Sequence, residues 1–118
     1  MTNDTTIIRA FMQAWGQQDL EGVLHFFAPD AIFIASAGPE PGRTHQGHAA
    51  IRSAVSAMFA TPQPASAVST EICSSGTEYF VTWASHAPAG GITAKGIDHF
   101  TIIDGKITLK DAYRKIAA

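Results

Sequence analysis

The chain has 118 residues, a formal net charge of −2 and one cysteine, Cys73. This length fits a single domain, which we assign to residues 1–118. Hydrophobic residues make up 46% of the chain and charged residues 15%, so there is enough apolar surface for a core and too little charge for disorder. The eight lysines and arginines are scattered, which argues against nucleic acid as a partner.

The sequence also argues against a membrane protein or a disulfide-bonded one. No run approaches the roughly 20 apolar residues that are needed to span a bilayer. The first twenty residues include Asp4, Arg9 and Asp19 and have no continuous apolar run of the kind found in a signal peptide. A single cysteine cannot form an internal disulfide. We therefore expect a soluble cytoplasmic protein without a membrane partner.

Two helices are predicted in the first third of the chain. Apolar residues recur at helical spacing over residues 7–15, after a stretch at 3–5 that can cap the start of the helix. Asp19 is expected to be the N-cap of a second, shorter helix, which Pro29 ends. The compact apolar run at 31–37 then predicts a short buried strand.

The rest of the chain is predicted to be a loop, a third helix and an antiparallel meander. Prolines and glycines in residues 38–47 indicate a loop, and residues 51–59 have a clear amphipathic helical pattern. Four strands are expected, at residues 67–73, 78–87, 92–103 and 106–116. Helices followed by such strands predict an α+β fold, in which about three helices pack on one face of a strongly curved antiparallel sheet.

The hairpin around Asp104-Gly105 is expected to position the candidate catalytic residues. Asp-Gly suits a two-residue type I′ turn, because both central positions of that turn need positive φ. If this turn sets the register, Phe100 faces Leu109, and Asp98 lies opposite Asp111. These two aspartates are then the only charged residues on an otherwise apolar face of the sheet.

Two carboxyl groups on adjacent strands should influence each other's ionisation. Directly opposed residues have Cβ atoms about 4.5–5.5 Å apart. Two carboxylates this close in a poor dielectric should not both be ionised, so at least one pKa is expected to rise. A neutral carboxyl can donate a hydrogen bond to a developing oxyanion. In the plainer alternative, the aspartates face solvent or neighbouring backbone, or a bulge shifts the register by one residue.

The chain resembles ketosteroid isomerase over nearly its whole length, within a wider superfamily that includes nuclear transport factor 2, SnoaL-like cyclases and limonene-epoxide hydrolases. The similar segments occur in the same order: Gln18–Val23, Phe27–Ala31, Ala49–Arg52, Ile97–Phe100 and the turn at Gly105–Ile107. The resemblance implies a cone-shaped fold with an internal apolar pocket and no cofactor. It also implies that Asp98 matches the protonated acid of that family's oxyanion hole.

Other parts of that family's site are replaced in this chain. Ala35 stands where the family has its catalytic aspartate, and Phe11 stands where it has an oxyanion tyrosine. Phe27 and Val55 occupy two further positions that can carry pocket tyrosines. Steroid isomerisation by the family's mechanism is therefore not expected. Glu40 and Asp111 are candidates to replace the missing base.

The expected site consists of two carboxyl groups and an apolar wall. Asp98 and Asp111 are the candidate catalytic residues. The candidate ligand-binding residues are Phe11, Trp15, Phe27, Ala35, Val55, Met58, Phe59, Trp83, Phe100 and Tyr113. No metal site is expected, because His45 and His48 on a loop lack the further ligands that zinc needs. The sequence assigns no role to His25, His45, His48, His86 or His99.

Two functions are consistent with these features. The first is a cofactor-free enzyme that acts on a small apolar carbonyl compound or epoxide, with Asp98 as acid or hydrogen-bond donor. The alternative is a ligand-binding or dimerisation module that kept the fold and lost the chemistry. A homodimer is expected in either case, because Thr70, Thr82, Thr101 and Thr108 suggest an outer sheet face suited to burial against a second copy.

Overall fold

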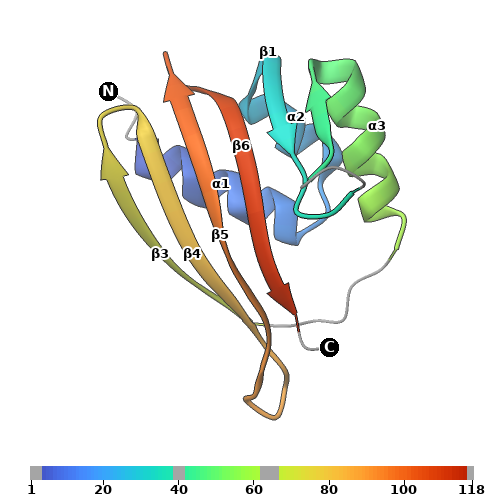
Figure 1. Cartoon of the computed structure of the whole chain (residues 1–118), viewed down its shortest axis with the longest axis vertical. Helices are drawn as coiled ribbons and strands as arrows, with labels where there is room; N and C mark the ends of the chain where they lie inside the picture. Colours follow the sequence, from blue (N-terminus) through green and yellow to red (C-terminus); the bar gives the residue numbers. More distant parts are fainter. Residues whose placement is uncertain (1–3, 39–41, 62–66, 117–118) are drawn as a thin grey trace.

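The computed structural model describes residues 4–38, 42–61 and 67–116 (Figure 1). Within these residues, three helices and six strands follow one another along the chain. They are α1 (Asp4–Gly16), α2 (Leu20–Phe26), β1 (Phe27–Ile34), β2 (Thr44–Gln46), α3 (His48–Phe59), β3 (Ala67–Ser75), β4 (Glu78–His86), β5 (Ile92–Ile103) and β6 (Lys106–Ile116). The prediction of an α+β fold with three helices packed on a curved, mostly antiparallel sheet is confirmed.

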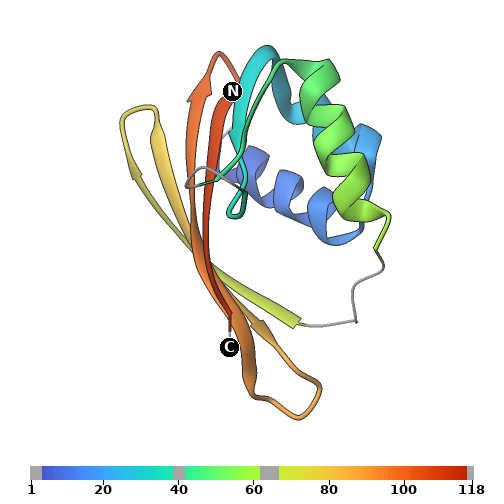
Figure 2. The same ribbon diagram turned by 45° about the vertical axis from the view of Figure 1, so that its right-hand side comes forward.

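The six strands form one sheet in the order β2-β1-β6-β5-β4-β3. Neighbouring strands are antiparallel, except that β1 and β6 are parallel. Figure 2 shows that the long strands bend and that the helices lie on one side of them. Because β1 follows α2 directly and pairs with the last strand, it ties the helical part of the chain to the middle of the sheet.

Helix α1 packs its apolar residues onto the sheet at helical spacing. Ile7, Ile8 and Phe11 are buried, and the ring of Phe11 contacts those of Phe27 and Phe100 edge-on, with centroids 5.4 and 5.6 Å apart. Edge-to-face contacts of this kind add to the free energy gained by burying the rings. The main core therefore lies between α1 and the strands.

The predicted N-cap of the second helix is confirmed. The Asp19 side chain accepts a hydrogen bond from the backbone N–H of Gly22 at 3.0 Å. A side-chain acceptor at this position satisfies one of the N–H groups that the first turn of a helix leaves unpaired.

The first two strands differ from the sequence prediction. The first strand begins at Phe27 instead of residue 31, so Pro29 lies within the strand instead of ending the preceding helix. The β1–β6 pairing is irregular between Phe27 and Ile32, and such irregular positions accommodate a residue without an N–H donor. The predicted loop at 38–47 contains strand β2.

The long strands have two distinct faces. Cross-strand partners share a face, and Val81, Asp98 and Ala112 form one row on the side of the helices, which we call the inner face. Phe80, His99 and Asp111 form a row on the opposite side, which we call the outer face. Thr70 is paired with Trp83 and borders a cavity beside α1, so the prediction that it lies on the outer face is wrong.

Among the described residues, no helix is long and apolar enough to cross a membrane.

Candidate functional site

The β5–β6 hairpin has a bulge that the sequence prediction did not include. Next to the turn, Ile102 pairs with Ile107 as predicted, but Thr101 pairs with Leu109. One residue of β6, Thr108, is therefore additional, as in a β-bulge. A bulge of one residue changes the face on which every later residue of the strand lies.

The predicted pairing of Asp98 with Asp111 is wrong. Asp98 lies opposite Ala112 on the inner face, and Asp111 lies opposite His99 on the outer face. The predicted pairing of Phe100 with Leu109 is also wrong, because its partner is Lys110. The bulge therefore separates the two aspartates and moves Lys110, which the unbulged register places on the polar face, to the inner one.

Lys110 is buried beside Asp98. The side chains of Lys110 and Asp98 are 6% and 7% exposed, and Nζ lies 3.9 Å from Oδ2 of Asp98. The same Nζ lies 4.4 Å from the ring centroid of Trp15 and 4.9 Å from that of Phe33. Aromatic faces attract cations at such distances, but they do not replace the water that burial removes from a charged amine.

Burial dominates the ionisation of both groups. Desolvation raises the pKa of Asp98 above its ordinary value, although the charge of Lys110 and a hydrogen bond with the Trp83 side chain act in the opposite direction. Desolvation lowers the pKa of Lys110, and the charges of Asp98 and Asp111 only partly oppose this effect. Both shifts favour the uncharged form of the group. A free amine beside a protonated carboxyl is therefore a more favourable pair of protonation states here than it would be in water.

Five residues from five elements make up this interior site. Asp98 lies on β5, Lys110 on β6, Trp83 on β4, Phe33 on β1 and Trp15 in the last turn of α1. Phe33 pairs with Lys110 across the parallel β1–β6 ladder, which fixes its ring beside the amine. The arrangement combines a proton donor, a potential nucleophile and an apolar aromatic wall, which are the components of a site for carbonyl chemistry.

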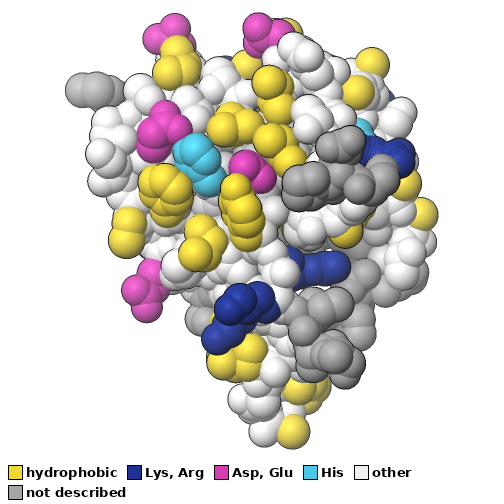
Figure 3. Space-filling view, in the orientation of Figure 1, with side chains coloured by type: hydrophobic (Ala, Val, Ile, Leu, Met, Phe, Trp, Pro, Cys, Tyr) yellow, Lys and Arg dark blue, Asp and Glu magenta, His cyan; other side chains and the backbone are white. Residues whose placement is uncertain are grey.

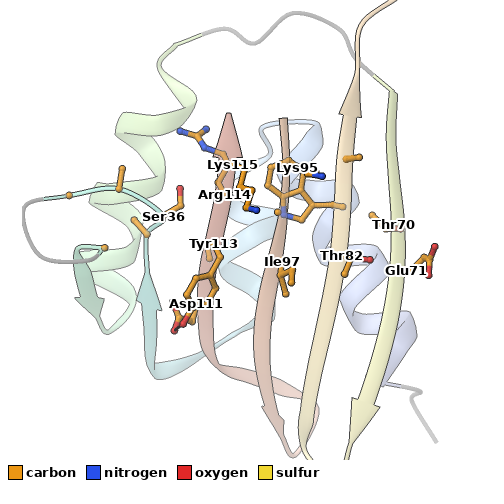
Figure 4. Close-up of a pocket in the computed structure, with 18 residues that line it drawn as sticks. Ser36, Thr70, Glu71, Thr82, Lys95, Ile97, Asp111, Tyr113, Arg114 and Lys115 are labelled. Atoms are coloured by element: carbon orange, nitrogen blue, oxygen red, sulfur yellow. Dashed lines mark hydrogen bonds between the residues drawn. The ribbon is translucent and has the colours of Figure 1, made fainter. Parts of the chain in front are cut away.

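A cavity of about 900 Å³ adjoins this site and opens on the outer face (Figure 4). Ile97, Asp111 and Tyr113 line it from the outer face, and their side chains point away from the helices in Figure 4. Trp83 and Ala112 of the inner face also border it. Ala112 is the cross-strand partner of Asp98, but Asp98 and Lys110 are not among the residues that line the cavity.

Positive charge gathers at one end of this cavity. Lys95, Arg114 and Lys115 all line it and lie near one another in Figure 4, where β5 and β6 run side by side. Figure 3 shows Lys and Arg side chains in the lower half of the same outer face.

The outer face also carries a polar cluster around His99. The His99 ring stacks on Phe80 with centroids 4.7 Å apart, and its Nε2 lies 2.7 Å from Oε1 of Glu78. Thr101 donates a hydrogen bond to the same carboxylate, and these bonds, that of Thr101 first, lower the pKa of Glu78. Tyr113 donates a hydrogen bond to Oδ2 of Asp111 at 3.1 Å. The hydrogen bonds that Glu78 accepts therefore favour its ionised form.

The expected ligand-binding residues fall into three groups. Phe11, Phe27, Val55 and Phe100 are fully buried in the core, and Trp15 and Phe59 pack against it. Met58 and Tyr113 are exposed, and Tyr113 also lines the outer side of the cavity. Ala35 and Trp83 border the cavity. The structure therefore brings Trp15 and Trp83 together with Asp98, and it separates Asp111 and Tyr113 from them.

The remaining candidates from the sequence do not join the interior site. His48 Nε2 lies 2.9 Å from the carbonyl oxygen of Phe27, and the His45 ring contacts that of Phe33. The described part of the chain has no group of three or more His, Cys, Asp or Glu residues that could hold a metal ion. Glu40, a candidate base, lies outside the described residues.

The sequence of this chain matches the model of a known domain family. The model of the SnoaL-like domain matches residues 8–110, which is most of the chain and includes Asp98 and Lys110. A search of curated protein sequences found no match.

Solved structures share the fold. An NTF2-like protein of unknown function from Burkholderia pseudomallei is 24% identical with a TM-score of 0.74, and the match covers 98% of this chain and 92% of that one. A similar protein from Mesorhizobium loti is 20% identical with a TM-score of 0.73, covering 95% and 90%. TerC, crystallised with polyporic acid, is 22% identical with a TM-score of 0.70, covering 95% and 91%. The expected likeness to the NTF2-like superfamily is confirmed.

Proposed function

This chain belongs to the SnoaL-like domain family, and we propose that it is a cofactor-free enzyme that acts on a small apolar carbonyl compound at the interior site. The fold is that of a domain family that binds or processes small molecules. The observation that carries the proposal is the buried Asp98–Lys110 pair, held between aromatic rings. For each group, the attraction of the other's charge is too weak to offset the cost of desolvation. Buried ionisable groups with pKa values shifted in this way are typical of functional sites.

The acid in the proposed reaction is Asp98. A carboxyl with a raised pKa keeps its proton at higher pH than an exposed one, so it can donate a hydrogen bond to a carbonyl oxygen and stabilise the charge that develops there. Lys110 lies 3.9 Å away and can hold or return the proton. Trp15 and Phe33 exclude water from the amine, which strengthens these electrostatic interactions.

Ligand binding without turnover is the second candidate. It is favoured by Phe11 and Ala35, which lack the hydroxyl and carboxyl groups expected at those positions in an active isomerase. TerC was crystallised with polyporic acid, which supports the capacity of this fold to hold an organic molecule. The two candidates differ in one measurable property, which is proton transfer to or from a bound carbonyl compound.

The test is α-proton exchange of acetophenone in D₂O, followed by ¹H NMR. The wild-type protein is expected to accelerate loss of the methyl signal, and Asp98→Asn should lower that acceleration by about 10²-fold or more, the usual contribution of a general acid. Asp111→Asn, on the outer face, should retain most of it. Saturable binding without acceleration would favour the binding candidate, and acceleration that depends on Asp111 alone would contradict the proposed site.

A further inference from the structure

We infer that Lys110 is a nucleophile that forms an imine with an aldehyde or ketone, so that the substrate becomes covalently attached inside the protein. This inference rests on the proposed function and deepens it, because it names the atom that attacks and narrows the substrate to a carbonyl compound. An epoxide would not form an imine.

The environment of Lys110 differs from that of the other lysines. Its side chain is 6% exposed, whereas Lys95 and Lys115 are exposed at the mouth of the cavity. The charged groups near its amine are Asp98 on β5 and Asp111 on β6 itself, and α1 and β1 present the rings of Trp15 and Phe33. An amine in such surroundings loses its proton more readily than an exposed one, and the free amine is the nucleophilic form.

The distance between Lys110 and Asp98 fits the intermediate of imine formation. At 3.9 Å, Nζ and Oδ2 are too far apart for a hydrogen bond. In a carbinolamine, the nitrogen and the hydroxyl oxygen are joined through one carbon atom, and the oxygen needs a proton donor about 2.7 Å away. A carboxyl group slightly beyond hydrogen-bond reach of the amine is placed to be that donor.

The step balances with the groups at the site. The Nζ lone pair attacks the carbonyl carbon, and the C=O π electrons move to the oxygen as the C–N bond forms. One proton from the nitrogen and one from the Asp98 carboxyl then leave with that oxygen as water, as the C–O bond breaks. The products are an iminium N–H, an ionised Asp98 and one water molecule, so no external oxidant or reductant is needed.

The surroundings of Lys110 stabilise the charged products of this reaction. The iminium cation and the new Asp98 carboxylate form an ion pair, and Trp15 and Phe33 already lie within cation–π distance of the nitrogen. The same rings favour an aromatic or otherwise apolar substituent on the carbonyl carbon. Trp83 and Ala112, which lie on the same face as Asp98, also border the cavity.

The test is reductive trapping with benzaldehyde and sodium cyanoborohydride at pH 7, followed by peptide mapping by mass spectrometry. The inference predicts that Lys110 gains a benzyl group faster than Lys95 in the same molecule, because a lowered pKa raises the fraction of free amine at pH 7. Lys110→Met should abolish this labelling, and Asp98→Asn should slow it. The ratio within the wild-type protein stands even if a variant fails to fold.

Labelling of Lys110 no faster than that of Lys95 would overturn the inference. If trapping fails at Lys110 while the Asp98-dependent exchange of acetophenone persists, the imine is wrong and the proposed function stands. If both trapping and exchange are absent, the proposed function fails together with the imine. Fast trapping that Asp98→Asn leaves unchanged would overturn the assignment of the acid.

Discussion

A lysine amine and a carboxyl lie together in this interior at a distance that does not make a hydrogen bond. A close ion pair regains part of its lost hydration through Coulomb attraction and hydrogen bonds, but a looser pair regains less. The pKa of Asp98 is raised and that of Lys110 is lowered, because the cost of desolvation outweighs the attraction of the partner's charge in both cases. The pair is therefore expected to reduce the stability of the fold.

Replacing both groups by uncharged residues should stabilise the protein near neutral pH. The raised pKa of Asp98 makes its contribution favourable at low pH, and that contribution is lost as pH rises from 3.8 through the folded pKa. The lowered pKa of Lys110 makes its contribution favourable at high pH, and that contribution is lost as pH falls from 10.5 through the folded pKa. Asp98→Asn with Lys110→Met should raise the free energy of unfolding by about 1–4 kcal/mol near neutral pH.

Urea unfolding from acid to alkaline pH measures this effect. The gain should shrink at low pH, where Asp98 is protonated in both states, and at high pH, where Lys110 is neutral in both states. Asp30→Asn with Lys95→Met, which changes the same residue types at exposed positions, should show no such dependence. A double variant that is less stable than the parent throughout would identify the pair as a stabilising ion pair.

Gly96 is a second residue on which the site depends. A Cβ atom there would lie 2.1 Å from the backbone oxygen of Tyr113 and 2.8 Å from Cζ2 of Trp83. Gly96→Ala should therefore push Trp83 away from Asp98 and lower the free energy of unfolding by about 1–3 kcal/mol. Gly91→Ala is the matched control, since a Cβ atom there has no atom within 4 Å. Equal melting temperatures for the two variants would contradict this packing.

The bulge at Thr108 decides the position of the site at the level of elements. Without it, Asp98 and Asp111 would lie opposite each other, and like charges on directly opposed residues are destabilising. With it, Asp98 lies opposite Ala112 on the face that also carries Lys110, and Asp111 accepts a hydrogen bond from Tyr113 on the outer face. The observed register therefore removes a carboxylate pair that the unbulged hairpin would bury.

The caps and turns of the elements were more predictable than their pairing. Asp19 as an N-cap, and the ends of β5 and β6 at the Asp104-Gly105 turn, follow from local residue preferences that the sequence displays directly. The bulge does not follow from them, because it depends on the side chains that the whole sheet brings together. Lys110 was missed for this reason, and the one signal for it was that the unbulged register paired two acids.

Removing the α2 cap should have a measurable effect on stability. Asp19→Ala leaves the backbone N–H of Gly22 without its acceptor, and it should lower the free energy of unfolding by about 1 kcal/mol. The control is Asp30→Ala. Asp30 is exposed and is not the N-cap of a helix, so this substitution should change the free energy of unfolding less. Chemical denaturation that finds no difference between the two variants would contradict the cap.

At the scale of the whole molecule, the outer face exposes more apolar surface than a solvated sheet needs. Phe80, Ile97 and Tyr113 are 42%, 44% and 59% exposed on adjacent strands. Figure 3 shows that hydrophobic side chains gather on this face, with Lys and Arg toward its lower part. A contiguous apolar patch of this kind typically marks a protein interface.

We expect a two-fold homodimer in which this outer face is buried. A two-fold axis that crosses the strands would bring the end with Lys95 and Lys115 near the partner's end with Glu78 and Asp111. Ile97→Glu should therefore yield monomers in light scattering at micromolar concentration. Ile92→Glu, at the first residue of β5, is the control and should leave the dimer intact. A wild-type monomer at that concentration would contradict the expectation.

We propose that small carbonyl compounds bind at Asp98 and Lys110 on the inner face, not at Asp111 and Tyr113. The chain has two tryptophans. Trp15 lies beside the Lys110 amine and Trp83 acts on the pKa of Asp98, so their indole N–H signals in ¹H–¹⁵N NMR report on the interior site. Titration with acetophenone should shift both signals saturably. Asp98→Asn should weaken the binding by about tenfold, which is about 1.4 kcal/mol, and Asp111→Asn should not. If Trp15 does not respond, or if Asp111→Asn alone abolishes the binding, the site is not at the buried pair.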